Sequence, residues 1–329
     1  MSKKIIILII VLILTPCCTV KESSRGNIDT LTIISSDEDR AVSEHIIEYY
    51  FNQRSIMTPQ EEYVYSIDWI PLENLNKSKL GRNILLLSIE HPIDNTIDIL
   101  TDKICSNNNI SEDLSSLKNL FAKNQQLIII KALDTIDLEN KLRNHFHWIA
   151  EEYNENIYSN YYDYIVSKGQ NIELESIIAD KFNLSMFVQE DYDLIKQDDD
   201  FIWIGRGYPY RWIMLYNIKK VGFNETDNLY DLFNAILDSN EVGIEIQSGY
   251  RKKTTLQYND LDIDIYRGLY DHKQSQTGGP FALYLLDNIN SDEVILVASV
   301  INNPGNTKMP HLLQMDALVR NINFLEERE

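Results

Sequence analysis

The sequence predicts an α+β fold in which two halves each combine a sheet with packed helices. Short apolar runs typical of strands follow one another with brief polar turns between them, and helical stripes separate these groups of strands. Grouped strands favour mainly antiparallel or mixed sheets over a regular alternation of strand and helix. No segment repeats with a period of roughly 20 to 50 residues, which argues against a solenoid.

The N-terminal half, residues 30–170, begins with a short apolar strand at 31–34. Ser36 is followed three residues later by Asp39, which is the spacing of a helix capping box. The sequence therefore predicts a helix over residues 39–53.

Two strongly apolar runs come next, 83–89 (NILLLSI) and 127–133 (LIIIKAL). Runs this short and this apolar are typical of central strands covered on both faces. Further along, apolar residues recur every three or four positions and predict one stripe of a long helix: Leu138, Leu142, Phe146, Ile149 and Tyr153.

The C-terminal half, residues 171–329, carries more strands than the first. The predicted strands are 184–188, 201–204, 211–219, 255–267, 280–286 and 293–301. The acidic run 198–200 predicts a turn rather than a metal site. Helical spacing predicts a helix over 229–237 and a final helix opened by Pro310. The two halves are expected to pack as separate domains or as one body.

The first residues of the chain predict its destination. Lys3 and Lys4 precede an unbroken apolar run over 5–14, which is the pattern of a secretory signal peptide covering residues 1–16. A permanent membrane helix would need about 20 apolar residues. Export with cleavage is therefore expected rather than a retained membrane span.

Cys17 and Cys18 add a predicted lipid attachment. Leu14-Thr15-Pro16-Cys17 resembles the box that ends bacterial lipoprotein signals, although Pro16 stands where a small residue is usual. Cys18 therefore remains a second candidate for acylation, and an ordinary cleaved signal is the alternative to both. The polar segment that follows, up to residue 29, is a flexible tether. We expect lipid anchoring to the cell-envelope membrane, on its periplasmic or surface side.

The composition argues against nucleic acid as a partner. The formal net charge is −20 and no basic tract is present, whereas nucleic-acid binding requires clustered Lys and Arg. The acidic body is also repelled by anionic lipid, so a lipid chain must provide the anchoring. Cys105 is the only other cysteine, and we expect it to be a small, partly buried residue rather than a reactive thiol.

The sequence shows no recognisable catalytic or metal-binding motif. Of the six histidines only His145 and His147 are close, and two residues apart on a helix they point in different directions. Asp260, Asp262 and Asp264 alternate with apolar residues, which predicts a strand with one acidic face rather than a calcium loop. No cofactor and no metal are expected.

Two segments concentrate arginine, glycine and aromatic residues, which are the types enriched at binding sites. The first contains Arg206, Tyr208, Tyr210, Arg211 and Trp212, and the second contains Arg267, Tyr270, Gly278, Gly279 and Pro280. Gly-Gly-Pro also predicts an unusual backbone turn. These residues are the candidate binding site. The alternative is that they are hairpin loops whose aromatic rings pack on the adjacent sheet.

These residues also carry a resemblance to a family of uncharacterised bacterial envelope lipoproteins, the domain of unknown function 4837 family. Besides the lipoprotein-like start, the features in order are Arg82-Asn83-Ile84-Leu85, Tyr266-Arg267-Gly268-Leu269, Gly278-Gly279-Pro280-Phe281, Pro304 and Lys308. They extend over nearly the whole exported body. Met309 and Tyr270 depart from the family pattern, which has a basic residue and a tryptophan there. The resemblance implies a shared location and fold but no activity.

The leading hypothesis is a non-enzymatic, lipid-anchored envelope protein that binds a protein or glycan partner through the arginine- and tyrosine-rich segments. The alternative is a hydrolase of envelope polymers that uses paired carboxylates in a cleft. With fifty acidic residues in the chain, the sequence alone cannot pair them.

Overall fold

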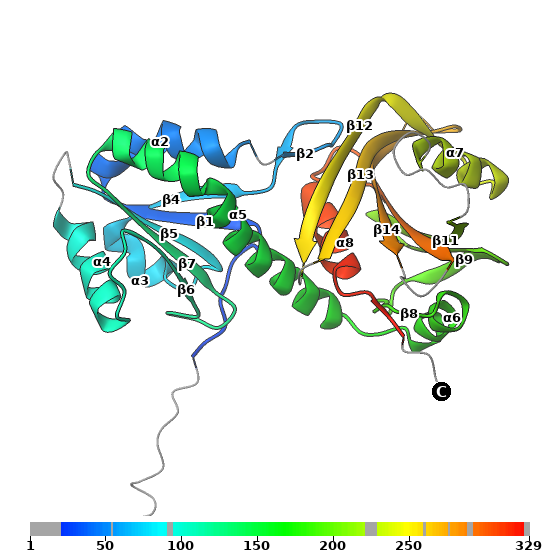
Figure 1. Ribbon diagram of the computed structural model, residues 1–329, viewed down its shortest axis with the longest axis horizontal. Coiled ribbons are helices and arrows are strands. Elements are labelled where there is room, and N and C mark those ends of the chain that lie inside the picture. The colour runs from blue at the N-terminus through cyan, green and yellow to red at the C-terminus, as the bar shows by residue number, and fades with distance from the viewer. Residues whose placement is uncertain are drawn as a thin grey trace, which may run out of the picture.

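The computed structural model describes residues 21–325 except 54, 91–94, 221–228, 259–260, 276 and 288–291, and it gives only the backbone for 95–96, 256–258 and 261–262. The predicted signal peptide, Cys17 and Cys18 lie outside the described residues, as does His91. The described part contains seven α-helices and sixteen strands in mixed and antiparallel sheets, which confirms the α+β prediction. Figure 1 shows two bodies side by side, joined by the long helix α5 (Thr135–Val166).

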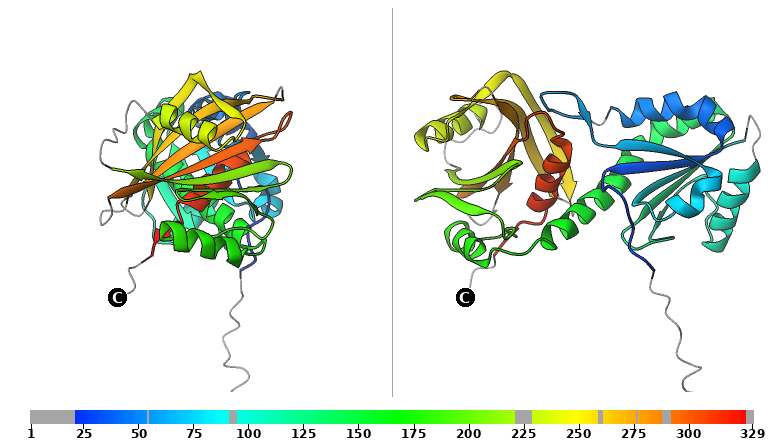
Figure 2. Two further views of the ribbon diagram at one scale, coloured as in Figure 1. Left: turned by 90° about the vertical axis from the view of Figure 1, so that its right-hand side faces the viewer. Right: turned by 180° about the vertical axis from the view of Figure 1, so that it is seen from behind.

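The N-terminal body is built on a five-stranded mixed sheet. Its strands, in spatial order, are β4 (Ser66–Pro71), β1 (Thr30–Ser35), β5 (Asn83–Ile89), β7 (Gln126–Ala132) and β6 (Leu114–Lys118). The first four run parallel and β6 is antiparallel to β7. Helices α2 (Asp37–Phe51) and α5 cover one face, and α3 (Leu75–Ser78) and α4 (Asn95–Asn107) cover the other (Figure 2).

The two apolar runs form the centre of this sheet, as predicted. In β5, Leu85 and Leu87 pack on the side of α2 and α5, whereas Ile84 and Leu86 pack on the side of α4. All four side chains are fully buried. A strand with helices on both faces has no solvent side, which explains why its sequence does not alternate. Ser36 caps α2 by accepting a hydrogen bond from the backbone N–H of Asp39, at 3.0 Å.

The C-terminal body is built on a seven-stranded antiparallel sheet. Its strands, in spatial order, are β12 (Ile244–Tyr258), β13 (Leu261–His272), β14 (Gly278–Asp287), β15 (Glu293–Asn302), β11 (Tyr210–Lys219), β10 (Phe201–Arg206) and β9 (Asp193–Asp198). Helix α7 (Leu229–Ser239) covers one face, and α6 (Ile172–Phe182) and α8 (Met309–Val319) cover the other. Two small ribbons complete the fold, β2 (Ser55–Ile56) with β3 (Glu62–Tyr63), and β8 (Leu184–Ser185) with β16 (Asn323–Phe324).

Two predictions for this sheet were incomplete. The predicted single strand over 255–267 spans parts of two strands, β12 and β13, which pair antiparallel. Strand β9 was missed because its sequence, DLIKQD, is largely polar and exposed at the edge of the sheet. The predicted turn at 198–200 is confirmed, since β9 ends at Asp198 and β10 begins at Phe201.

Helix α8 is shared by the two bodies. Met309, Leu313 and Ala317 lie four residues apart and pack in the core of the N-terminal body, while Met315 and Leu318 pack in the C-terminal core. Because α8 contributes side chains to two hydrophobic cores, almost all of its residues are buried.

The N-terminus of α8 receives its cap from the other body. Lys308, in the N-cap position, provides no side-chain cap. Instead, Glu62 of β3 accepts hydrogen bonds from the backbone N–H groups of Lys308 (2.8 Å) and Met309 (2.7 Å). A carboxylate is favourable there because helix N-termini carry unpaired N–H groups and a partial positive charge. The contact therefore fixes the β2–β3 ribbon onto α8.

Candidate functional site

The two arginine- and aromatic-rich segments meet at one end of the C-terminal sheet. Tyr210, at the start of β11, pairs with Asn302 at the end of β15. The side chain of Asn302 donates a hydrogen bond to the hydroxyl of Thr277, at 3.3 Å, and Thr277 directly precedes β14. We call the surface formed by residues 206–210, 277 and 302–306 the loop end.

The loop end presents two tyrosines to solvent. Tyr208 is 58% exposed and Tyr210 is 47% exposed. Their ring centroids are 5.9 Å apart and their planes are nearly perpendicular. Asn306, from the neighbouring loop, donates a hydrogen bond to the Tyr208 hydroxyl at 2.8 Å. The aromatic pair is therefore accessible and is held by a second loop.

Arg206 and Trp212 flank this pair and are less accessible. Arg206 forms an ion pair with Asp191, and its guanidinium lies 5.8 Å from the centroid of the Tyr192 ring. Trp212 packs edge-on against Trp203, with centroids 5.2 Å apart. Arg206 can still contribute a cation at the border of the loop end, whereas Trp212 is mainly a packing residue.

Arg211 is buried beneath helix α8, where it lacks a charged partner. It is 7% exposed, and its Nη1 donates to Gln314 Oε1 at 2.5 Å. Among the described residues it has no ion pair. Burial lowers the pKa of Arg211, because removing the guanidinium from water disfavours its charged form.

Arg267 is also buried beneath α8, but it has a carboxylate partner. It is 5% exposed, and its Nη2 lies 2.7 and 2.8 Å from the two carboxylate oxygens of Asp316. Tyr284 donates a further hydrogen bond to Asp316 Oδ1, at 2.5 Å. Burial alone would lower the pKa of Arg267, but the Asp316 carboxylate outweighs that effect and the pKa is raised. Arg211 and Arg267 thus both attach α8 to the sheet.

The remaining motif residues lie within the sheet, where all but the partly buried Gly278 are buried. The Tyr270 hydroxyl donates to the backbone carbonyl of Ile301 at 3.1 Å. Gly278, Gly279 and Pro280 open strand β14 instead of forming the predicted turn. A Cβ on Gly278 would lie 2.3 Å from the carbonyl oxygen of Tyr270, and a Cβ on Gly279 would lie 2.0 Å from that of Ile301. These glycines therefore permit close packing of neighbouring strands.

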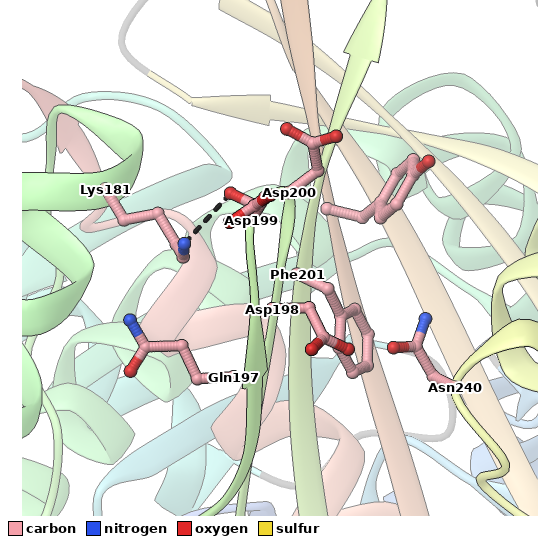
Figure 3. A pocket seen from close by; sticks show the side chains of 8 residues that line it. Lys181, Gln197, Asp198, Asp199, Asp200, Phe201 and Asn240 are labelled. Atoms are coloured by element: carbon pink, nitrogen blue, oxygen red, sulfur yellow. Dashed lines mark hydrogen bonds between the residues drawn. The ribbon is translucent and has the colours of Figure 1, made fainter.

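The acidic turn at 198–200 borders an open hollow of about 670 Å³ (Figure 3). Lys181 donates to the backbone carbonyl of Asp199 at 2.9 Å, and Asp198 forms an ion pair with Lys196 at 3.1 Å. Within the described ranges no group of three or more His, Cys, Asp or Glu side chains is arranged to hold a metal ion.

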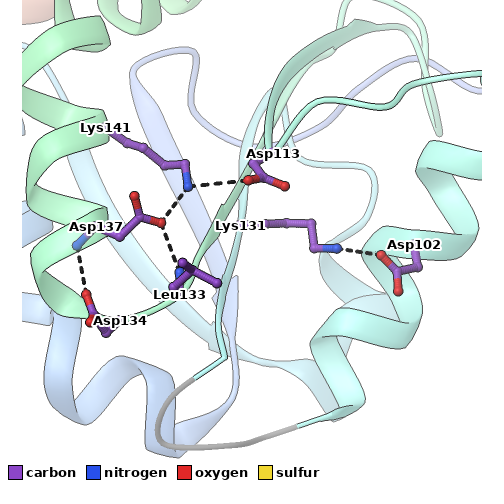
Figure 4. Close-up of polar contacts among 7 residues, drawn as sticks. All are labelled: Asp102, Asp113, Lys131, Leu133, Asp134, Asp137 and Lys141. Carbon is purple, nitrogen blue, oxygen red and sulfur yellow. Dashed lines mark hydrogen bonds and ion pairs between the residues drawn. The ribbon is translucent and has the colours of Figure 1, made fainter.

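Acidic residues at the carboxyl edge of the N-terminal sheet are neutralised by lysines (Figure 4). Lys131 pairs with Asp102 at 2.5 Å, and Lys141 pairs with Asp137 at 2.6 Å and with Asp113 at 3.5 Å. The hydrogen bond from Lys141 lowers the pKa of Asp137. A general acid requires the opposite shift, so Asp137 gives no support to paired-carboxylate chemistry.

Sequence reasoning missed the polar residues of α8. Gln314 and Asp316 lie in a helix that is otherwise strongly apolar, and each binds one of the arginines that the sequence had singled out. A carboxylate within such a stripe is a usable signal, because buried charges are normally paired. Met309, which departs from the family pattern, packs in the N-terminal core.

Two different family models match the two halves of the chain. Residues 171–321 match the family model described as a domain of unknown function (DUF4837), and residues 24–162 match a second domain of unknown function (DUF8532). The first match confirms the resemblance to this family for residues 171–321 alone, whereas Arg82-Asn83-Ile84-Leu85, which the resemblance also included, lies within the second match. No curated protein matches the chain.

Two of the solved structures that match the chain resemble it only distantly. A crystal structure from Bacteroides thetaiotaomicron has 9% sequence identity and a TM-score of 0.28, with 44% of this chain and 46% of that chain covered. The Ran-binding protein Mog1p of Saccharomyces cerevisiae has 9% identity and a TM-score of 0.30, with 44% and 91% covered. This chain therefore spans less than half the length of the first of these structures.

Proposed function

We propose that this chain, whose residues 171–321 belong to the DUF4837 family of unknown function, is a non-enzymatic, lipid-anchored envelope protein that binds a protein or glycan partner. The observation that carries this proposal is the exposed tyrosine pair of the loop end, Tyr208 and Tyr210. Tyrosine gives a large contact area with little loss of side-chain entropy, and it is enriched at binding hot spots.

The surroundings of the tyrosines support binding. Arg206 supplies a partly exposed cation, and Asn306 supplies an amide next to the Tyr208 hydroxyl. Aromatic faces with neighbouring amides and a guanidinium suit either a sugar polymer or a polar protein surface. The loops stand on a seven-stranded sheet, and such a scaffold is the usual support for functional loops.

Replacing Tyr208 and Tyr210 together by alanine should weaken capture of an envelope partner by about tenfold or more, the effect of losing a hot spot. Folding should be unchanged because both rings are exposed. Full-length protein in neutral detergent would be incubated with envelope extracts and with purified envelope polysaccharide, and the retained protein and sugar would be quantified.

Tyr250→Ala is the matched control, because Tyr250 is 52% exposed but lies on β12, away from the loop end. Equal retention by the double variant, the control and the wild type would contradict binding at the loop end.

The proposed anchor is the lipid on Cys17 or Cys18. No helix in the described part of the chain is both long and apolar enough to cross a membrane. The support is the sequence pattern alone, in which charged residues and a short apolar run precede the cysteine pair. Several acyl chains together suffice for stable attachment.

Replacing Cys17 and Cys18 together by serine should abolish labelling by a tagged fatty acid and move the protein out of the membrane fraction. Each single variant would show which cysteine is acylated. Cys105→Ser is the control, because Cys105 is buried in the N-terminal core and should not affect labelling. Undiminished labelling of the double variant would exclude the anchor.

One observation favours the hydrolase alternative. Burial raises the pKa of Asp29, which lines a crevice of about 750 Å³ together with Glu61 and Glu62. Glu62, however, is engaged by the backbone of α8. Shortening of envelope polymer incubated with the protein would favour hydrolysis over binding.

A further inference from the structure

A pocket of about 560 Å³ lies between the two bodies, away from the loop end. We call it the seam pocket. Its N-terminal wall comes from α5 and the β2–β3 region, and its C-terminal wall comes from the β12–β13 hairpin and the end of α8. The lining residues used below are Asn154, Glu155, Tyr158, Lys252, Arg267 and Arg320.

Two buried arginines line the seam pocket. Arg267 and Arg320 are 5% and 3% exposed. Each is ion-paired on one side, Arg267 with Asp316 and Arg320 with Glu155. The Arg320 guanidinium also lies 4.5 Å from the centroid of the Tyr158 ring. Moving a charged guanidinium out of water costs free energy. Two buried arginines beside one cavity therefore indicate a role other than packing.

Arg267 retains hydrogen-bonding capacity. Both of its hydrogen bonds to Asp316 come from Nη2, and Nη1 has no hydrogen-bond partner within the described part of the chain. A guanidinium has five N–H donors in a planar fork that matches carboxylate and phosphate oxygens. Nη1 is itself closed off from solvent, so an oxyanion in the pocket would contact the small exposed part of the Arg267 side chain and not this atom.

Lys252 adds a third cation to the same wall. It is directly opposite Arg267 in the antiparallel register of β12 and β13, so both side chains leave the same face of the hairpin. The pocket is thus lined by Lys252, Arg267 and Arg320 against two carboxylates, Glu151 and Glu155. Glu151 is paired with His147 at 2.9 Å, and the side chain of Glu155 is half exposed. With Asp316, which pairs with Arg267, three carboxylates balance the three cations, so in a chain of net charge −20 the pocket is locally neutral rather than acidic.

We infer that the seam pocket binds a small molecule bearing an oxyanion, either a carboxylate or a phosphate, against Arg267, Arg320 and Lys252. The pocket volume lies within the range of about 300 to 1,000 Å³ typical of small-molecule sites. The hydrogen bonds would be charge-assisted and partly shielded from water, which strengthens them. Because both bodies line the pocket, the bound molecule contacts each of them. This inference does not depend on the loop end.

The experiment titrates full-length protein in neutral detergent with inorganic phosphate and, separately, with citrate, at constant ionic strength made up with chloride. Calorimetry should show saturable binding of at least one of them, and the preferred one identifies phosphate or carboxylate as the ligand chemistry. Lys252→Gln should weaken that binding by about fivefold. Asn154→Asp keeps an oxygen that accepts the hydrogen bond from the Tyr65 hydroxyl, but it adds a negative charge to the pocket wall. This variant should weaken anion binding at least as much as Lys252→Gln does.

Lys253→Gln is the matched control. Lys253 is the next residue along β12, but it faces the other side of the hairpin, where it pairs with Asp264 at 2.6 Å and lies over Tyr266. Its substitution should leave the affinity unchanged. Absence of saturable binding to both anions, or an equal loss in the Lys252 and Lys253 variants, would overturn the proposal.

Discussion

Replacing Asp316 by alanine should lower the free energy of unfolding by about 3 to 5 kcal/mol, the usual cost of breaking a buried ion pair by removing one partner. Asp316 is fully buried, and its carboxylate accepts hydrogen bonds from both Arg267 and Tyr284. Without it, the Arg267 guanidinium stays in the core with no compensating charge. The midpoint of denaturant unfolding, followed by circular dichroism, would measure the loss.

Two further variants separate loss of the charge pair from loss of volume. Tyr284→Phe removes one hydrogen bond to Asp316 and should cost about 1 kcal/mol. The double variant Arg267→Met with Asp316→Leu removes both charges and should recover much of the stability lost in the single variant. If Asp316→Ala unfolded at the wild-type midpoint, the ion pair would have no role in holding α8 on the sheet.

Replacing Gly279 by alanine should cost about 3 kcal/mol or more, at the upper end of overpacking substitutions. The added Cβ would lie 2.0 Å from the carbonyl oxygen of Ile301 on the adjacent strand β15. That obstacle is backbone, so relief requires β14 and β15 to separate at the start of their pairing. Soluble yield and thermal unfolding temperature would both fall.

Gly249→Ala is the control for this prediction. Gly249 also lies in a strand of the same sheet, β12, but a Cβ there would meet no atom within 4 Å. Its substitution should leave the unfolding temperature nearly unchanged. Equal behaviour of the two variants would show that Gly279 is not needed for close strand packing.

The fold was predictable where burial follows from local pattern. The runs 83–89 and 127–133 are mostly apolar because helices cover both faces of β5 and β7. The helix at 229–237 was predicted from its apolar spacing and is present as α7. In contrast, β9 and much of β12 are polar and exposed, so they lack the apolar run on which strand prediction depends.

The candidate site was predictable in composition but not in arrangement. The sequence identified Arg211 and Arg267 as unusual, yet burial gives them roles beneath α8 that local pattern could not reveal. Their partners, Gln314 and Asp316, are 103 and 49 residues further along the chain. Contacts at such separations follow from tertiary packing alone. The exposure of Tyr208 and Tyr210 likewise depends on where the hairpin between β10 and β11 ends.

The cap that Glu62 places on α8 has a consequence for how the chain can be divided. The two family matches meet between residues 162 and 171, which suggests two independent modules. A fragment beginning at residue 171 would nevertheless retain α8 without its cap, and it would expose the apolar stripe of Met309, Leu313 and Ala317. The family boundary is therefore not a folding boundary, because helix α8 of the C-terminal half completes the hydrophobic core of the N-terminal half.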